Sequence, residues 1–211
     1  MKKSIITLLV LAAVFTAFKS PKKESVVLND AIKISKTSTE DNVDVTASIL
    51  TWKGSKPTGS HDGTVALKSG NLEMKNGSLI GGVFVVDLNT IKNLDMEGSG
   101  GADKIVGHLK GADFFDVAKY PTSTFTITSV KNNDSNLAVT GNLQIKDVTK
   151  SITIPATITT EDGVITFKSE TFNVNRADFN VKYGSKSFFD NLKDKFIDDM
   201  MEFSFTVKTK A

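Results

Sequence analysis

An alternation of apolar and polar residues with a period of two recurs along most of this 211-residue chain and constrains its fold more than any other feature. In residues 43–50, Val43, Val45, Ala47 and Ile49 fall on one face. The same pattern recurs in residues 64–68, 83–87, 124–130, 137–146, 151–159, 164–172 and 202–208. Period two is typical of β-strands, and clusters of Gly, Asn, Asp and Ser separate the runs. The sequence therefore predicts an all-β protein made of antiparallel hairpins.

The number of strands bears on how the sheet is completed. An open sheet of about eight strands has two unpaired edges, and closure into a barrel removes them. We therefore favour an extended, eight-stranded antiparallel β-barrel over a sandwich, which the same strands also permit. Pro155 within residues 151–159 indicates a bulge or an edge, because proline cannot donate a hydrogen bond to a ladder.

Two segments have helical rather than strand-like spacing. Residues 102–115 form the first, and residues 187–196 form the second, with Ser187 suited to be its N-cap. Four side chains share one face of the second segment: Phe188, Phe189, Leu192 and Phe196. We expect both helices to plug or flank the barrel.

The N-terminal 20 residues have the pattern of a secretory signal peptide. Lys2 and Lys3 precede an apolar run from Ile5 to Phe18, which is too short to span a bilayer comfortably. The sequence thus predicts a cleaved signal at residues 1–20, a single domain over residues 21–211 and a periplasmic or secreted location. The chain has no cysteine, which excludes disulfides, a thiol nucleophile and a lipid-anchoring cysteine.

The charge balance argues against a nucleic acid partner. Once residues 1–20 are removed, 23 basic groups face 24 acidic groups, and Arg176 is the single arginine of the chain. Proteins that bind nucleic acids usually carry a basic stripe, and none is present here.

The residues that usually carry chemistry form no catalytic or metal-binding pattern. His61 and His108 are 47 positions apart and belong to no metal-ligand motif. Nucleophile elbows and phosphate-binding glycine loops are also missing. Asp113 and Asp116 are interpreted as turn caps rather than as an acid–base pair. We therefore expect no metal, no cofactor and no enzymatic activity.

Apolar side chains instead dominate the predicted interior. The chain has 14 Phe against one Trp and two Tyr, and aromatic side chains without a polar group suit a dry interior. Strand parity places nine side chains there: Ile49, Phe84, Phe125, Ile127, Leu143, Ile145, Phe167, Phe203 and Phe205. An eight-stranded barrel either fills with such side chains or holds one elongated ligand, and parity does not distinguish the two.

Five segments together resemble the successive signatures of the YceI-like family of exported bacterial proteins. They are residues 52–70, 84–96, 108–125, 141–156 and 175–185, and they follow one another in order over nearly the whole chain after the signal. The resemblance implies a lipocalin-like barrel whose lumen holds a polyisoprenoid lipid, of the quinone or polyprenyl phosphate type, for carriage or storage. It implies no catalytic motif. Residues 25–42 depart from the family's first strand because they are polar.

Two polar side chains in these segments are candidates for contact with a ligand headgroup. His108 either anchors the turn that follows it or faces the headgroup. Arg176 either binds an anionic headgroup or forms a buried ion pair with an acid such as Asp178 or Asp190. Phe114 and Phe115 are expected to close one end of the barrel.

Other kinds of function stay open at this point. The chain could be a non-enzymatic interaction or stress module with a filled barrel, or a small enzyme acting on a hydrophobic substrate. As partners we expect an isoprenoid lipid and transient contact with a membrane surface. Sequence does not distinguish a monomer from a homodimer.

Overall fold

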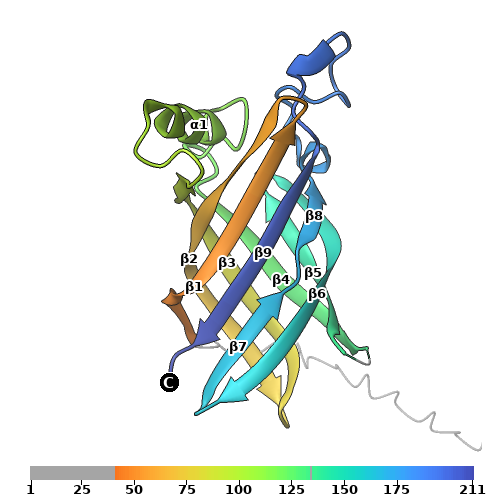
Figure 1. The fold of residues 1–211 in the computed structure, drawn as a ribbon. Helices are drawn as coiled ribbons and strands as arrows, with labels where there is room; N and C mark the ends of the chain where they lie inside the picture. Colours follow the sequence, from red (N-terminus) through yellow and green to blue (C-terminus); the bar gives the residue numbers. More distant parts are fainter. Residues whose placement is uncertain (1–40, 134) are drawn as a thin grey trace, which may run out of the picture. The chain divides into compact units, whose positions relative to one another are not determined.

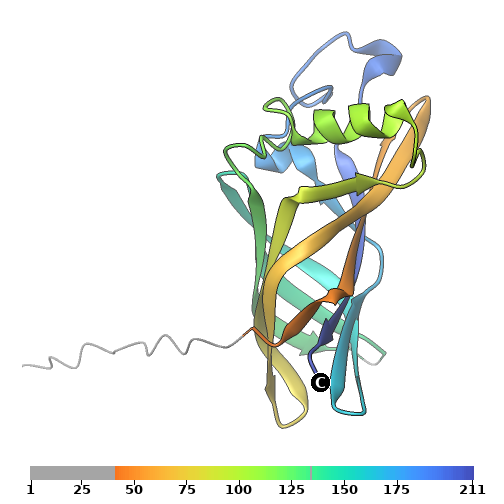
Figure 2. The same cartoon turned by 90° about the vertical axis from the view of Figure 1, so that its left-hand side faces the viewer.

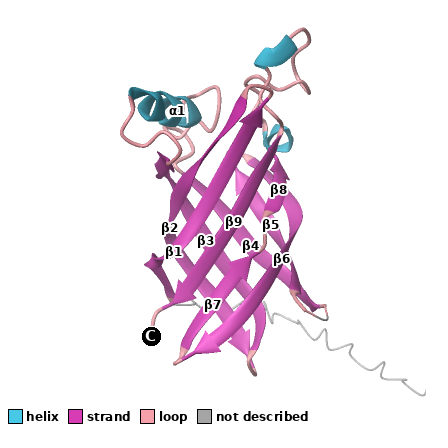
Figure 3. Ribbon diagram, viewed as in Figure 1, coloured by secondary structure: helices cyan, strands magenta, loops and turns pink. Residues whose placement is uncertain are grey.

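A computed structural model describes residues 41–133 and 135–211, and strands dominate them (Figures 1 and 3). The strands are β1 (Val43–Lys56), β2 (Gly59–Lys75), β3 (Ser78–Asn93), β4 (Thr122–Asn132), β5 (Leu137–Ile145), β6 (Val148–Glu161), β7 (Val164–Ser169), β8 (Phe172–Asn175) and β9 (Met200–Thr209). Apart from Lys146 and residues 170–171, all residues of the segments with period-two alternation lie in strands, so the all-β prediction is confirmed. The predicted signal peptide and most of the polar stretch 25–42 lie outside the described residues.

The strands close into a barrel. Each strand from β1 to β6 pairs antiparallel with the next, and β7 pairs with β9. Strand β9 also pairs with β1, as at Val43 and Thr209. Strands β7 and β8 occupy one position in the barrel, because both pair with the same side of β9 at different heights. Thr166 lies opposite Lys208 and Phe172 lies opposite Phe203. Nine strand segments thus make the predicted eight-stranded barrel.

Pro155 marks a change in the pairing of β6. The ladder with β5 passes through it without a register shift, and Ala138 lies opposite. Its carbonyl accepts a hydrogen bond from the Glu170 N–H at 3.0 Å, just past the point where the ladder between β6 and β7 ends at Ala156 and Ser169. Pro155 therefore lies where β6 loses its neighbour β7, which agrees with the edge position that the sequence indicated.

A bulge in β1 changes which side chains face the interior. The Asp44 carboxylate accepts a hydrogen bond from the Ala47 N–H at 3.1 Å, and the register with β9 shifts between Asp44 and Ile49. Such a bulge inverts the alternation beyond it. Leu50 and Trp52 consequently face the interior. The placement of Ile49 in the lumen is wrong, since 49% of its surface is exposed.

The first predicted helix is present but shorter and earlier. Helix α1 (Gly100–Lys110) begins after Ser99, whose side chain accepts a hydrogen bond from the Ala102 N–H. It lies across one end of the barrel with Leu109 buried (Figure 2). No helix among residues 41–133 and 135–211 is long and apolar enough to cross a membrane.

The second predicted helix, over residues 187–196, is wrong. The segment is a loop with one short 3₁₀ turn, η2 (Lys193–Lys195); another, η1 (Arg176–Phe179), follows β8. Asn191 and Lys193 have φ of 64° and 49°, a backbone conformation that interrupts an α-helix. Ser187 is no N-cap, because its hydroxyl donates to the Asp199 carboxylate at 2.6 Å.

Candidate functional site

A cavity lies inside the barrel. It has a volume of about 1000 Å³, counting the part open to solvent, and its wall includes side chains from all nine strands. Strand β9 shows how the wall is built, because successive side chains of a strand point to opposite faces. Its alternate residues Met201, Phe203, Phe205 and Val207 all line the cavity. Space that is not occupied by side chains is therefore present inside the barrel.

The wall is apolar and its few polar side-chain groups are already hydrogen-bonded. Among the residues that the structure describes in the wall, only Trp52 and Ser123 carry a side-chain N–H or O–H group. The Trp52 indole donates to the Thr64 carbonyl at 3.3 Å, and the Ser123 hydroxyl donates to the Gln144 carbonyl at 2.6 Å. None of the titratable side chains in residues 41–133 and 135–211 lines the cavity. The wall therefore presents apolar contacts and offers no acid or base.

Three phenylalanines form the floor of the cavity. The rings of Phe84 and Phe167 stack with centroids 5.9 Å apart, and the Phe205 ring lies 4.9 Å from that of Phe167. Ile127 belongs to the same buried cluster but does not line the cavity, and the cluster continues beyond the three rings. Buried apolar side chains therefore occupy that end of the barrel.

Seven of the nine side chains predicted for the lumen do line this cavity. They are Phe84, Phe125, Leu143, Ile145, Phe167, Phe203 and Phe205. Ile127 is buried beyond the floor, and Ile49 lies outside the barrel. Strand parity missed Leu50 and Trp52, because the β1 bulge is invisible in the alternation. It also missed Leu109 and Phe115, which come from α1 and the turn after it rather than from a strand.

The turn after α1 closes part of the other end of the cavity. Phe115 lines the cavity and Phe114 is buried beside it, with ring centroids 4.9 Å apart. This confirms that the pair closes one end. Asp116 shapes the turn through its backbone, with φ of 51° and a hydrogen bond from its N–H to the Gly111 carbonyl at 2.8 Å. No side-chain hydrogen bond of Asp113 or Asp116 caps this turn among the described residues.

His108 packs at this end but does not line the cavity. Its ring lies 5.6 Å from that of Phe114 and 4.3 Å from that of Tyr183, both edge-on. Its Nδ1 atom is 3.9 Å from the Asp113 carboxylate, and its buried Nε2 atom has no hydrogen-bond partner in the described part of the chain. The ring therefore joins α1 to the loop that contains Tyr183, which is the anchoring role rather than a contact with the cavity.

Arg176 is a structural clamp and its guanidinium does not reach the cavity. The residue is 1% exposed, and its three side-chain nitrogens donate to the carbonyls of Asp198, Val181 and Ile197 at 3.0, 2.8 and 2.9 Å. Its Nη2 atom also lies 3.3 Å from the Asp199 carboxylate. Burial lowers the pKa of Arg176, and the charges of Asp199 and Asp198 oppose that effect. The buried ion pair is present, but with Asp199 instead of the expected Asp178 or Asp190.

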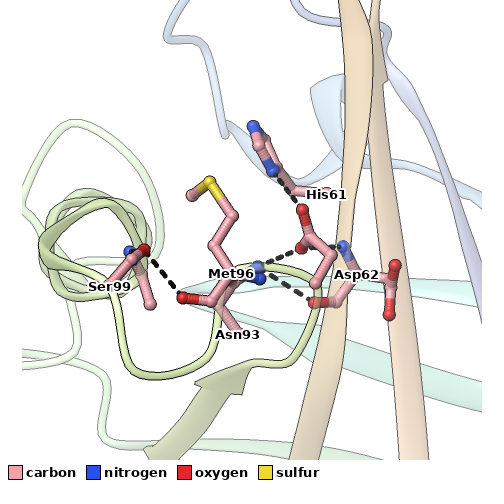
Figure 4. A network of polar contacts seen from close by, with 7 residues as sticks. His61, Asp62, Asn93, Met96 and Ser99 are labelled. Carbon is pink, nitrogen blue, oxygen red and sulfur yellow. Dashed lines mark hydrogen bonds and ion pairs between the residues drawn. The ribbon is translucent and has the colours of Figure 1, made fainter.

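His61 takes part in a polar network at the start of the turn before α1 (Figure 4). Its Nδ1 atom lies 2.8 Å from the Asp95 carboxylate, which also accepts a hydrogen bond from the Asp62 N–H at 3.0 Å. Asn93 donates to the Asp62 carbonyl at 3.0 Å and accepts from the Met96 N–H at 3.2 Å. The network fixes the path from β3 to α1. Within the described ranges, no cluster of three or more residues could hold a metal ion.

Comparison with solved structures identifies relatives of this barrel. BcnA of Burkholderia cenocepacia superposes with a TM-score of 0.65 at 21% identity, covering 80% of this chain and 100% of that one. A Saccharophagus degradans protein, described as a polyisoprenoid binding domain implicated in plant cell wall breakdown, superposes with a TM-score of 0.62 at 19% identity, covering 81% and 97%. At such identities the likeness concerns the fold alone.

Sequence comparison relates the chain to a named family. Protein YceI of Escherichia coli O17:K52:H18 and that of Salmonella arizonae are each 51% identical to it over 49 residues, 23% of this chain. The matched segment spans about a quarter, 26%, of the length of those relatives. The model of the YceI-like domain matches residues 36–209, nearly the whole described region. The chain therefore belongs to the YceI-like domain family.

Proposed function

We propose that this chain is an exported, non-enzymatic lipid-binding protein that holds a polyisoprenoid chain, of the quinone or polyprenyl phosphate type, in the barrel cavity for carriage or storage. The observation that carries the proposal is the wall, in which all side-chain N–H and O–H groups already have backbone partners. Such a wall favours a ligand that is itself apolar along its length. The relative described as a polyisoprenoid binding domain has the same fold, which supports the choice of lipid class.

The energetics favour exchange with a membrane over tight storage. Full burial of a prenyl chain of about forty carbons is worth roughly 30 kcal/mol at ~0.8 kcal/mol per methylene-sized unit. Non-covalent affinities saturate near about 18 to 21 kcal/mol, so most of this gain is offset by ordering of the chain and by its favourable solvation in the bilayer. For exchange to occur, the free energy of the prenyl chain in the cavity therefore has to be close to its free energy in the bilayer interior. An apolar wall without charged groups meets that requirement.

Native mass spectrometry tests the proposal directly. We expect protein purified from its producing cell to carry an adduct whose extracted lipid shows the repeating mass of isoprene units. A mass without adduct that stays unchanged after incubation with quinones and polyprenyl phosphates in detergent micelles would contradict lipid binding.

A matched pair of variants then locates the ligand. Val86 lines the cavity, whereas the neighbouring Val85 points to the other face of β3 and does not. Val86→Trp places extra volume in the cavity, and we expect it to lower the amount of bound lipid by at least about tenfold. Val85→Trp should bind as the wild type does. Equal lipid content in the two variants would place the ligand elsewhere.

A further inference from the structure

The loop of residues 182–200, which includes Met200, the first residue of β9, carries an unusual share of the exposed apolar surface. Four of the seven large apolar side chains that are exposed among the described residues lie there: Tyr183 at 46%, Phe188 at 41%, Phe189 at 48% and Met200 at 50%. The apolar pattern of residues 187–196 predicts a buried helix face, yet both phenylalanines point to solvent. Clustered exposed apolar side chains on a folded domain mark a contact surface.

Lysines accompany these aromatic rings. The Lys182 Nζ atom lies 4.9 Å from the centroid of the Phe188 ring, and the Lys186 Nζ atom lies 3.4 Å from that of Phe196. Residues 182–196 contain four Lys and two Asp, whereas the rest of residues 41–211 contains 15 basic and 19 acidic groups. Over all of residues 182–200 the four Lys are matched by four Asp, but Asp198 and Asp199 lie at the base of the loop beside Arg176. The excess positive charge is therefore confined to residues 182–196, and this part of the loop favours an anionic partner.

The base of the loop is firmly held, so its tip is presented in a defined position. Arg176 binds the carbonyls of Val181 and Ile197 at the two ends of the loop. The N–H groups of Phe188 and Phe189 both donate to the Ser185 carbonyl, at 3.2 and 3.0 Å. Contacts made by a pre-ordered tip lose less conformational entropy on binding.

The loop adjoins the end of the cavity opposite the phenylalanine floor. It projects from the same end of the barrel as α1 (the blue loop at the top of Figure 1). Tyr183 packs on His108 of α1, and Leu109 of the same helix lines the cavity. Met201, which lines the cavity, comes one residue after the exposed Met200. A partner bound to this loop would therefore lie next to the cavity end that α1 covers.

We propose that the loop of residues 182–200 docks the protein on the surface of an anionic lipid bilayer. Phe188 and Phe189 insert at the level of the headgroups, and Lys182 and Lys186 contact lipid phosphates. Aromatic rings flanked by lysines suit this interface, because the rings enter the boundary of the acyl chains while the ammonium groups stay with the headgroups. The inference rests on the proposed function in one respect: docking here would let the lipid pass between bilayer and cavity.

Vesicle sedimentation with matched double variants tests the docking surface. The protein is used as recovered from the producing cell, with vesicles of phosphatidylcholine with and without phosphatidylglycerol. Phe188→Ser/Phe189→Ser removes the aromatic tip. Ile49→Ser/Ile80→Ser is the control, because these side chains are as exposed, at 49% and 52%, but lie on β1 and β3.

We expect the wild type and the isoleucine control to bind the anionic vesicles equally, and the phenylalanine variant to bind at least about tenfold more weakly. Lys182→Gln/Lys186→Gln should lose roughly fivefold per lysine on anionic vesicles and little on neutral ones. Equal binding by the phenylalanine variant and the isoleucine control would overturn the docking surface. Absence of binding by the wild type would do the same.

Lipid uptake separates this inference from the proposed function. From detergent micelles, which need no docking, the wild type and Phe188→Ser/Phe189→Ser should take up a polyprenyl lipid equally. From vesicles, the variant should take it up more slowly. If the variant takes up lipid from vesicles as fast as the wild type does, as well as from micelles, docking by this loop is overturned and the proposed function is left intact. Failure of both proteins to take up lipid from micelles would instead refute the proposed function, and sedimentation alone would then decide the docking surface.

Discussion

Replacement of Arg176 by methionine tests whether this residue clamps the fold or recognises a ligand. The methionine keeps much of the side chain's apolar volume but removes the hydrogen bonds to the carbonyls of Val181, Ile197 and Asp198, which hold the ends of the loop together. It also leaves the carboxylate of Asp199, only 17% exposed, without its cation.

The expected loss follows from these contacts. Removing one partner of a buried ion pair costs about 3–5 kcal/mol, largely because the remaining charge stays buried and unpaired. For a domain of this size each kcal/mol lowers the melting temperature by roughly 2–4 °C, so Arg176→Met should lower it by roughly 6–20 °C. Arg176→Lys should recover only part of this, because an ammonium cannot reproduce the planar arrangement of donors.

Thermal unfolding followed by circular dichroism measures the change. The double variant Arg176→Met/Asp199→Asn is the informative control, because it removes the unpaired carboxylate as well and should be less destabilised than the two single changes added together. A loss of less than about 1 kcal/mol in Arg176→Met, combined with loss of lipid binding, would refute the clamp and favour the headgroup role.

Two further predictions concern a close approach of strands and the network in Figure 4. Gly141→Ala should destabilise the barrel by about 1–3 kcal/mol, because its methyl group would meet the ring of Phe125. Gly107→Ala, whose methyl group would lie in open space within α1, should stabilise the protein by about 0.5–1 kcal/mol. Urea unfolding measures both changes, and equal effects on the free energy of unfolding would contradict the packing argument. Burial raises the pKa of Asp95, but hydrogen bonds from His61 and its other neighbours outweigh this and leave the pKa below its usual value. The ionised Asp95 thus stabilises the fold above pH ~4, and this contribution disappears as pH falls through the lowered pKa, so Asp95→Asn should flatten the acid limb of a stability–pH curve. An unchanged acid limb would refute this role.

The strands could be predicted because each carries its own signal. A half-buried strand has to alternate, so all eight segments are visible in the sequence and their closure follows from the need to pair both edges. The floor of the cavity was also within reach of this reasoning, since Phe84, Phe167 and Phe205 lie on the interior faces of their strands. Family resemblance pointed to the same architecture, and the match over residues 36–209 confirms the family.

The errors arose where backbone geometry overrides the pattern. The alternation of residues 43–50 runs on unbroken through the bulge, so only the structure shows that Ile49 faces outward and Leu50 inward. Residues 187–196 have helical spacing, but the positive φ values of Asn191 and Lys193 and the hydrogen bonds of the loop ends to Arg176 enforce a different path. Local spacing carries no information about such distant contacts.

The distribution of polar groups restricts how a ligand could lie in the barrel. A polar headgroup placed against the phenylalanine floor would lose its water and find no free hydrogen-bonding side chain, since Trp52 and Ser123 are already bonded. At the opposite end, by contrast, Lys146 directly follows Ile145, which lines the cavity, and donates to the carbonyls of Phe114 and Asn180 at 3.3 Å. Under the proposed function the apolar tail therefore lies toward the floor and the headgroup toward α1. The lipid would then leave the barrel headgroup first, at the end from which the loop of residues 182–200 projects.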